Sequence, residues 1–142
     1  MDAMQISRSG LDVEWQRLQV IAQNLANIDT SKTITGAPYR ALRLVSGPSE
    51  TFADVVARKG TSGKPTGVKV LGLEVQPGGV RRVYDPNDPQ ADAKGFVTYP
   101  AIDHAGEMTL LIRTSRAYEA NLTAMSIAHQ MYARALEFGR QG

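Results

Sequence analysis

The sequence predicts an α+β protein in which long N- and C-terminal helices pack as a coiled-coil-like pair, with a small antiparallel β region between them. Apolar residues recur every seven positions near both ends of the chain, the spacing of a helix face that packs on another helix. The middle is instead rich in Gly, Pro, Ser and Thr, which is typical of loops and short strands. We therefore divide the chain into an N-terminal helix at 1–30, a central loop and β region at 31–106 and a C-terminal helix at 107–142.

The first helix is predicted from about Asp2 to Ile28, a stretch with no proline and only one glycine, Gly10. One face carries Met4, Leu11, Leu18, Ile21, Leu25 and Ile28. A second stripe, on a different face, is formed by Ile6, Val13 and Val20. A helix packed on a small domain usually carries a single apolar stripe. The second stripe therefore favours a bundle or the wall of a tube.

The central region contains short strand-like segments separated by turn residues. A strand is predicted at 39–45, and residues 46–67 are expected to form a mobile, variable loop with room for one helical turn. The alternating segment 68–75 and the segment 80–84 are joined by Pro-Gly-Gly, so the second is expected to be the antiparallel return of the first. A last short strand is predicted at 96–99.

The second helix is predicted from near Glu107 to about Phe138, with Gly139 just beyond its end. At about 1.5 Å per residue it would be roughly 50 Å long, too long for its own small domain to cover. Alanines along its apolar face allow close packing. The expected contacts with other helices are the stripe residues Leu11, Leu18, Ile21, Leu25, Ile28, Leu111, Tyr118, Leu122, Met125 and Tyr132.

The composition argues against several kinds of partner. The formal net charge of +2 is not concentrated in any segment, so we expect no nucleic-acid partner. No window approaches the roughly 18 apolar residues of a transmembrane helix, so we expect no direct membrane insertion. The first ten residues lack a basic start and an apolar run, which predicts no cleavable signal peptide. The absence of cysteine removes disulfides, thiol catalysis and thiolate metal sites.

No group of residues predicts catalysis, a cofactor or a metal. The segment 60–64 (Gly-Thr-Ser-Gly-Lys) faintly resembles a phosphate loop, but it lacks the first glycine and the final Ser or Thr of that motif. The segment that begins at Asp85 lacks the Gly and Glu of a calcium loop. The sequence contains no nucleophile motif of the Gly-x-Ser-x-Gly kind that His104 or His129 could activate as a base. We therefore expect no catalytic, cofactor-binding or metal-binding residues.

Four segments near both ends and in the centre form a recognisable combination: Ser-Gly-Leu at 9–11, Ala-Gln-Asn-Leu-Ala-Asn at 22–27, Val-Tyr-Asp-Pro at 83–86 and Ser-Arg-Ala-Tyr-Glu-Ala-Asn at 115–121. Together they resemble the flagellar rod and hook protein family. The motif residues are Asn24, Asn27, Tyr84, Asp85, Pro86, Arg116, Glu119 and Asn121. Hook and distal-rod members are much longer, so a length of 142 residues indicates the short, proximal-rod type.

The resemblance implies a non-enzymatic structural subunit of the bacterial flagellar basal body. Its partners would be other flagellar rod proteins, copies of itself and the flagellar export apparatus. It would lie in the periplasmic rod, exported without a cleaved signal peptide. The terminal helices would pack beside those of neighbours, and both chain ends would be partly disordered before assembly. A charge at Leu25 or Tyr118 should then abolish incorporation without affecting expression.

Two other classes of protein remain open from the sequence. One is a self-contained helical scaffold or chaperone-like protein of an export system, which would be stably folded alone. The other is a small enzyme with a deep polar pocket, for which the sequence offers no constellation of catalytic residues.

Asn24, Asn27 and Asn121 lie near the packed faces, where buried amides can fix the register between helices. Solvent-exposed asparagines are an equally good interpretation of these positions.

Overall fold

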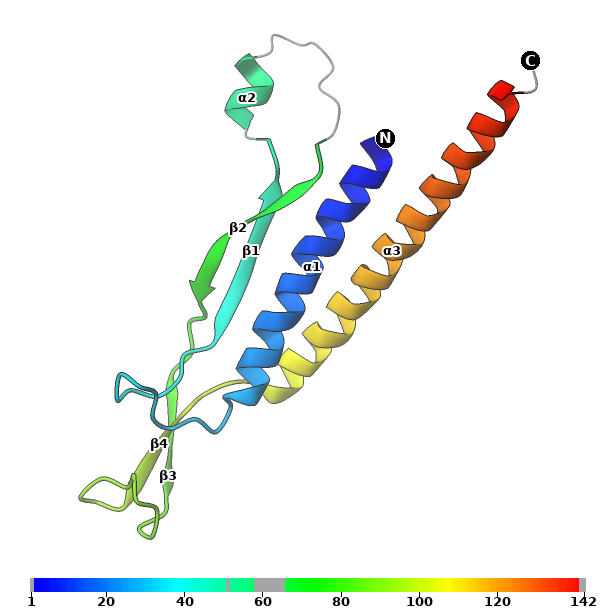
Figure 1. Ribbon diagram of the computed structural model, residues 1–142. Coiled ribbons are helices and arrows are strands. Elements are labelled where there is room, and N and C mark those ends of the chain that lie inside the picture. Colours follow the sequence, from blue (N-terminus) through cyan, green and yellow to red (C-terminus); the bar gives the residue numbers. More distant parts are fainter. Residues whose placement is uncertain (1, 51, 58–65, 141–142) are drawn as a thin grey trace. The chain divides into compact units, whose positions relative to one another are not determined.

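The computed structural model describes residues 2–50, 52–57 and 66–140. Its elements in chain order are α1 (Asp2–Ala26), β1 (Leu42–Pro48), α2 (Phe52–Ala57), β2 (Val68–Val75), β3 (Val80–Tyr84), β4 (Phe96–Pro100) and α3 (His104–Arg140) (Figure 1). The predicted α+β class, with long terminal helices and small antiparallel sheets between them, is confirmed. The phosphate-loop-like segment 60–64 lies outside the described residues.

The strands form two separate two-stranded sheets, β1 with β2 and β3 with β4. In the second sheet the strands are antiparallel, and Val80 lies opposite Pro100. The prediction that β3 is the return strand of β2 was therefore wrong. The Gln76 amide donates to the carbonyl of Ala41, and the Gly79 carbonyl accepts from the amide of Ala101. The Pro-Gly-Gly segment is thus bonded to residues that flank β1 and β4, and it makes no hairpin turn.

The first strand lies later in the chain than predicted. β1 begins at Leu42 and continues through Pro48, into the segment 46–67 that was expected to be loop. The residues before it form a loop in which the Tyr39 amide donates to the carbonyl of Thr30. Helix α2 supplies the helical turn expected in 46–67. The variable character of that segment stays a prediction.

The helix boundaries differ slightly from those predicted. α1 ends at Ala26, where the Asn27 side chain donates to the carbonyl of Gln23 and accepts from the Thr30 hydroxyl. The Gln23 carbonyl also accepts from the backbone amide of Asn27, so the side chain adds a second bond at the last turn of the helix. α3 begins at His104, after Asp103, a residue type preferred at helix N-caps. It extends through Gly139, which was expected to lie beyond its end.

The chain divides into two compact units. Unit 1 comprises Met1–Gln16, Val45–Gly72 and Thr114–Gly142, and unit 2 comprises Arg17–Leu44 and Leu73–Arg113. The predicted division at 1–30, 31–106 and 107–142 stays a prediction. No helix in the described part of the chain is both long enough and apolar enough to span a membrane.

Each unit buries one residue or more of the second apolar stripe of α1. In unit 1, Val13 is 4% exposed, and in unit 2, Val20 is 8% exposed. In unit 1 the same helix contacts β2, where the Val68 amide donates to the Ser9 hydroxyl. The chain itself therefore covers at least part of the face that we expected a neighbouring molecule to cover.

Candidate functional site

Asn24 is the centre of a buried polar cluster in unit 2. Its side chain is 0% exposed. Its amide nitrogen donates to the carbonyl of Leu42 at 2.8 Å and to Glu107 Oε2 at 3.1 Å. Its amide oxygen accepts from the Leu42 amide at 2.9 Å and from the Tyr39 hydroxyl at 3.0 Å. One side chain thus ties α1 to the start of β1 and to α3, the register-fixing role considered for this amide.

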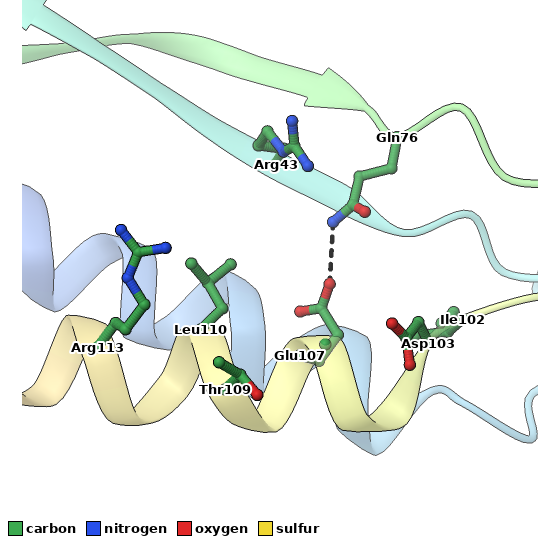
Figure 2. Close-up of a pocket in the computed structure, with 9 residues that line it drawn as sticks. Arg43, Gln76, Ile102, Asp103, Glu107, Thr109, Leu110 and Arg113 are labelled. Carbon is green, nitrogen blue, oxygen red and sulfur yellow. Dashed lines mark hydrogen bonds between the residues drawn. The ribbon is translucent and has the colours of Figure 1, made fainter.

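Glu107 carries a carboxylate into the same cluster, and it is only 6% exposed. Its Oε1 accepts from Gln76 Nε2 at 3.0 Å, the bond drawn in Figure 2. Gln76 Nε2 also donates to the carbonyl of Leu42 at 3.1 Å. Burial, and then the charge of Glu107, raise the pKa of Tyr39. Both oxygens of the Glu107 carboxylate accept hydrogen bonds from neutral amide groups, which offsets part of the cost of its burial.

A cavity of about 380 Å³ lies next to Glu107 in unit 2. Its lining residues come from the start of β1, the segment after β2 and the first turns of α3 (Figure 2). They are Arg43, Gln76, Ile102, Asp103, Gly106, Glu107, Thr109, Leu110 and Arg113. In the described part of the chain, no group of three or more His, Cys, Asp or Glu residues could hold a metal ion.

The first motif segment, at 9–11, holds unit 1 together. The Ser9 hydroxyl donates to the Ile6 carbonyl at 2.7 Å and accepts from the Val68 amide at 3.1 Å. Gly10 faces the side chain of Asn121 on α3, and a Cβ at position 10 would lie 2.9 Å from its Nδ2. Two motif segments from opposite ends of the chain therefore meet here, and the glycine allows the helices to approach closely.

The central motif shapes the loop between β3 and β4. Gly95 has a positive φ of 77°, and a Cβ there would lie 2.9 Å from the Tyr84 ring and 3.2 Å from the Pro86 Cβ. Only glycine combines that backbone conformation with this close approach at little cost. Asp85 accepts from the Asn87 amide, which closes the turn locally. These residues serve the fold of the loop within the subunit.

The predicted assembly residues differ in exposure. Ile21 is fully buried within unit 2, whereas Leu122 and Tyr132 are exposed. The half-buried members are Leu11, Leu18, Leu25, Ile28, Leu111, Tyr118 and Met125. Tyr118 lies 6.4 Å from Trp15, measured between ring centroids. Their role as contacts between subunits stays a prediction.

The C-terminal stretch of α3 presents a large apolar surface. Its exposed apolar side chains are Leu122, Ile127, Met131, Tyr132, Leu136 and Phe138. Phe138 reaches 77% exposure. The motif residues Arg116 and Glu119, one turn earlier, are also exposed. At about 100° per residue, Leu122, Tyr132 and Leu136 share one face of the helix, and Ile127, Met131 and Phe138 share the opposite face. A monomeric protein rarely leaves this much apolar surface open to water, so the surface indicates an interaction site.

Sequence reasoning missed part of the buried cluster. Tyr39, Gln76 and Glu107 were not among the predicted site residues, although they surround Asn24. The first turn of a helix favours acidic residues because of the helix dipole. Glu107 therefore carried no signal of its buried partners in the sequence.

Comparison with known proteins identifies the class of protein to which the chain belongs. Residues 93–138 match the family described as "Flagellar basal body rod FlgEFG protein C-terminal". The exposed helix face and this match together define a flagellar basal-body rod protein. The chain is 37% identical to the flagellar basal-body rod protein FlgC of Bacillus subtilis strain 168, over 97% of each chain. It is 35% identical to FlgC of Escherichia coli O157:H7, over 99% of this chain and 98% of that protein.

A third relative, FlgC of Aquifex aeolicus, is 34% identical over 96% of this chain and 94% of its own length. The chain therefore belongs to the FlgC family of flagellar basal-body rod proteins. The resemblance seen in the sequence is confirmed, and the protein is a structural subunit of the flagellar basal body.

Proposed function

We propose that the chain builds the proximal part of the rod by packing its terminal helices against those of neighbouring subunits. In this role it is a non-enzymatic part of the drive shaft that crosses the periplasm. The observation that carries the proposal is the exposed apolar stripe of α3 formed by Leu122, Tyr132 and Leu136. This part of α3 carries apolar side chains that the described residues of the chain leave exposed to solvent.

The energy available from this stripe is large enough for assembly. Full burial of one large apolar side chain contributes about 1.5–3 kcal/mol. Leu122 and Leu136 are each about half exposed, so covering them would contribute about 1 kcal/mol apiece. Summed over the stripe, and repeated for each subunit in a closed array, such contacts would give a stiff shaft from individually modest interactions.

Export is the second part of the proposal. We infer that the flagellar export apparatus carries the chain to the rod without cleavage of a signal peptide. The absence of cysteine supports this route, because the chain could pass through a narrow channel and enter an oxidising compartment without forming crosslinks.

Deletion of the gene, with complementation by the wild-type chain, tests the role in the rod. We expect loss of hook and filament in the deletion strain, and the chain in basal bodies purified from the complemented strain. Normal flagella in the deletion strain, with the chain in the cytosol, would instead support the self-contained helical scaffold.

A pair of variants tests the helix face. Leu122→Lys places a charge on the exposed stripe, and Thr123→Lys places the same charge about 100° around the helix. Both side chains are exposed, so neither change should unfold the subunit. We expect Leu122→Lys to be absent from basal bodies and Thr123→Lys to be incorporated. Equal incorporation of both variants would refute the assignment of this face.

A further inference from the structure

We propose that the cavity beside Glu107 receives an acidic side chain of a neighbouring rod subunit, held by Arg43 and Arg113. The inference rests on the rod function proposed above and adds a specific polar contact to it. The cavity has a volume of about 380 Å³, enough for one side chain, and lies wholly within unit 2. Its lining shares no residue with the apolar stripe of α3.

The cationic side comes from the two arginines. Arg43 projects from β1 and Arg113 from α3, and both side chains line the same cavity (Figure 2). Both are exposed, and within the described residues neither guanidinium group makes a hydrogen bond or an ion pair. A guanidinium group carries five N–H donors in a planar fork that matches the two oxygens of a carboxylate. Donors of this strength are therefore free at the rim of the cavity.

Of the two carboxylates in the lining, that of Glu107 is already hydrogen-bonded within the subunit. Glu107 accepts from Asn24 on one oxygen and from Gln76 on the other. Asp103 is turned over the first turn of α3, where a Cβ on Gly106 would lie 2.5 Å from its Oδ2. A carboxylate in that position is stabilised by the N-terminal end of the helix dipole. The hydrogen-bond donors that remain in the cavity are thus mainly those of the arginines, and Asp103 is the carboxylate left beside them.

The rest of the lining suits the stem of a protein side chain. Ile102 and Leu110 are half-buried and give the cavity an apolar wall. The methylene groups of a Glu or Asp side chain would pack there while the carboxylate reaches the arginines. Arginine is enriched at protein interfaces, and its pairs with carboxylates are among the stronger polar contacts. These features favour an acidic side chain from a partner subunit over a free small anion.

The test compares Arg43→Gln/Arg113→Gln with Arg40→Gln, in cells that lack the native chain. Arg40 is exposed and belongs to the same unit, but it does not line this cavity. We expect the amount of the double variant in purified basal bodies to fall about tenfold or more. Arg40→Gln should be incorporated like wild type. The circular dichroism spectra of all the purified chains should coincide, because the three side chains are exposed.

A charge reversal, Arg43→Glu/Arg113→Glu, then identifies the partner. Selection for restored motility should yield changes of an Asp or Glu to Lys or Arg in a rod subunit. Wild-type incorporation of both double variants would overturn the inference, as would binding of inorganic phosphate at the cavity with no effect of the substitutions on assembly. Wild-type chain missing from basal bodies would instead refute the rod function itself, so the two failures are distinguishable.

Discussion

Replacing Asn24 with alanine should destabilise unit 2 more than any surface substitution. The change removes four hydrogen bonds, two to Leu42 and one each to Glu107 and Tyr39. The Leu42 carbonyl keeps its bond from Gln76. The Tyr39 hydroxyl belongs to a half-buried residue, so we expect water to replace its lost partner.

The groups left without partners set the size of the effect. The part-buried Leu42 amide loses the amide oxygen it donates to, and an unsatisfied donor costs about 1–3 kcal/mol when it is fully buried. The Glu107 carboxylate loses the hydrogen bond that its Oε2 accepts from Asn24, and a hydrogen bond to a carboxylate is worth about 1.5–3 kcal/mol. Because these contributions share one cluster and are not additive, we expect a total loss of about 3–5 kcal/mol.

Urea unfolding followed by circular dichroism measures this loss, with Gln23→Ala as the matched control. Gln23 precedes Asn24 on the same helix, but it is exposed. The control should therefore change the free energy of unfolding by no more than about 0.5 kcal/mol. Hydrogen exchange at the Leu42 amide gives a local readout and should accelerate in Asn24→Ala alone. A loss below about 1 kcal/mol would refute the central role of this side chain.

Three further predictions concern unit 1, the β3–β4 loop and α3. Gly10→Ala should raise the free energy of unfolding by about 1 kcal/mol in an Asn121→Ala background. In wild type the gain should be clearly smaller, because the new Cβ meets the Asn121 amide. Equal effects in both backgrounds would contradict the close contact. The hydrogen bond from the Phe96 amide lowers the pKa of Asp92 below its usual 3.8. The contribution of the ionised Asp92 carboxylate to stability should be complete above pH 3.8 and should disappear as pH falls through the lower, folded-state pKa. Loss of the protection of the Phe96 amide from hydrogen exchange already at pH 5 would contradict this. In the isolated chain, amides of 122–140 should exchange rapidly by NMR, whereas cooperative protection of both long helices would rule out disorder before assembly.

The helices were predictable because their signal is local. A seven-residue apolar repeat without proline specifies a packed helix wherever it occurs, and α1 and α3 follow it. The β2 and β3 segments were also located from residue type. Their pairing was not, because Pro-Gly-Gly is typical of a turn. β2 pairs with β1 instead, and the Gln76 amide donates to Ala41 just beyond that pair; no local pattern encodes such a distant partner.

The buried cluster shows the same limit. Asn24 and Glu107 are 83 residues apart in the sequence, and nothing in either segment identifies the other. Asn24 could be singled out only as an amide near a packed face. The second stripe of α1 was correctly identified as apolar, but Val13 and Val20 are covered within the subunit. Periodicity predicts that a face is buried and leaves open which molecule buries it.

The central claim is that the exposed face of α3 becomes buried in the rod, and thiol labelling tests it most directly. The chain contains no cysteine, so Leu122→Cys introduces a single reporter on that face. Maleimide labelling is measured for the free subunit and for purified basal bodies, with the denatured protein defining complete reaction. The account predicts rapid labelling of the free subunit and protection in the basal body. Equal labelling in both states would contradict it.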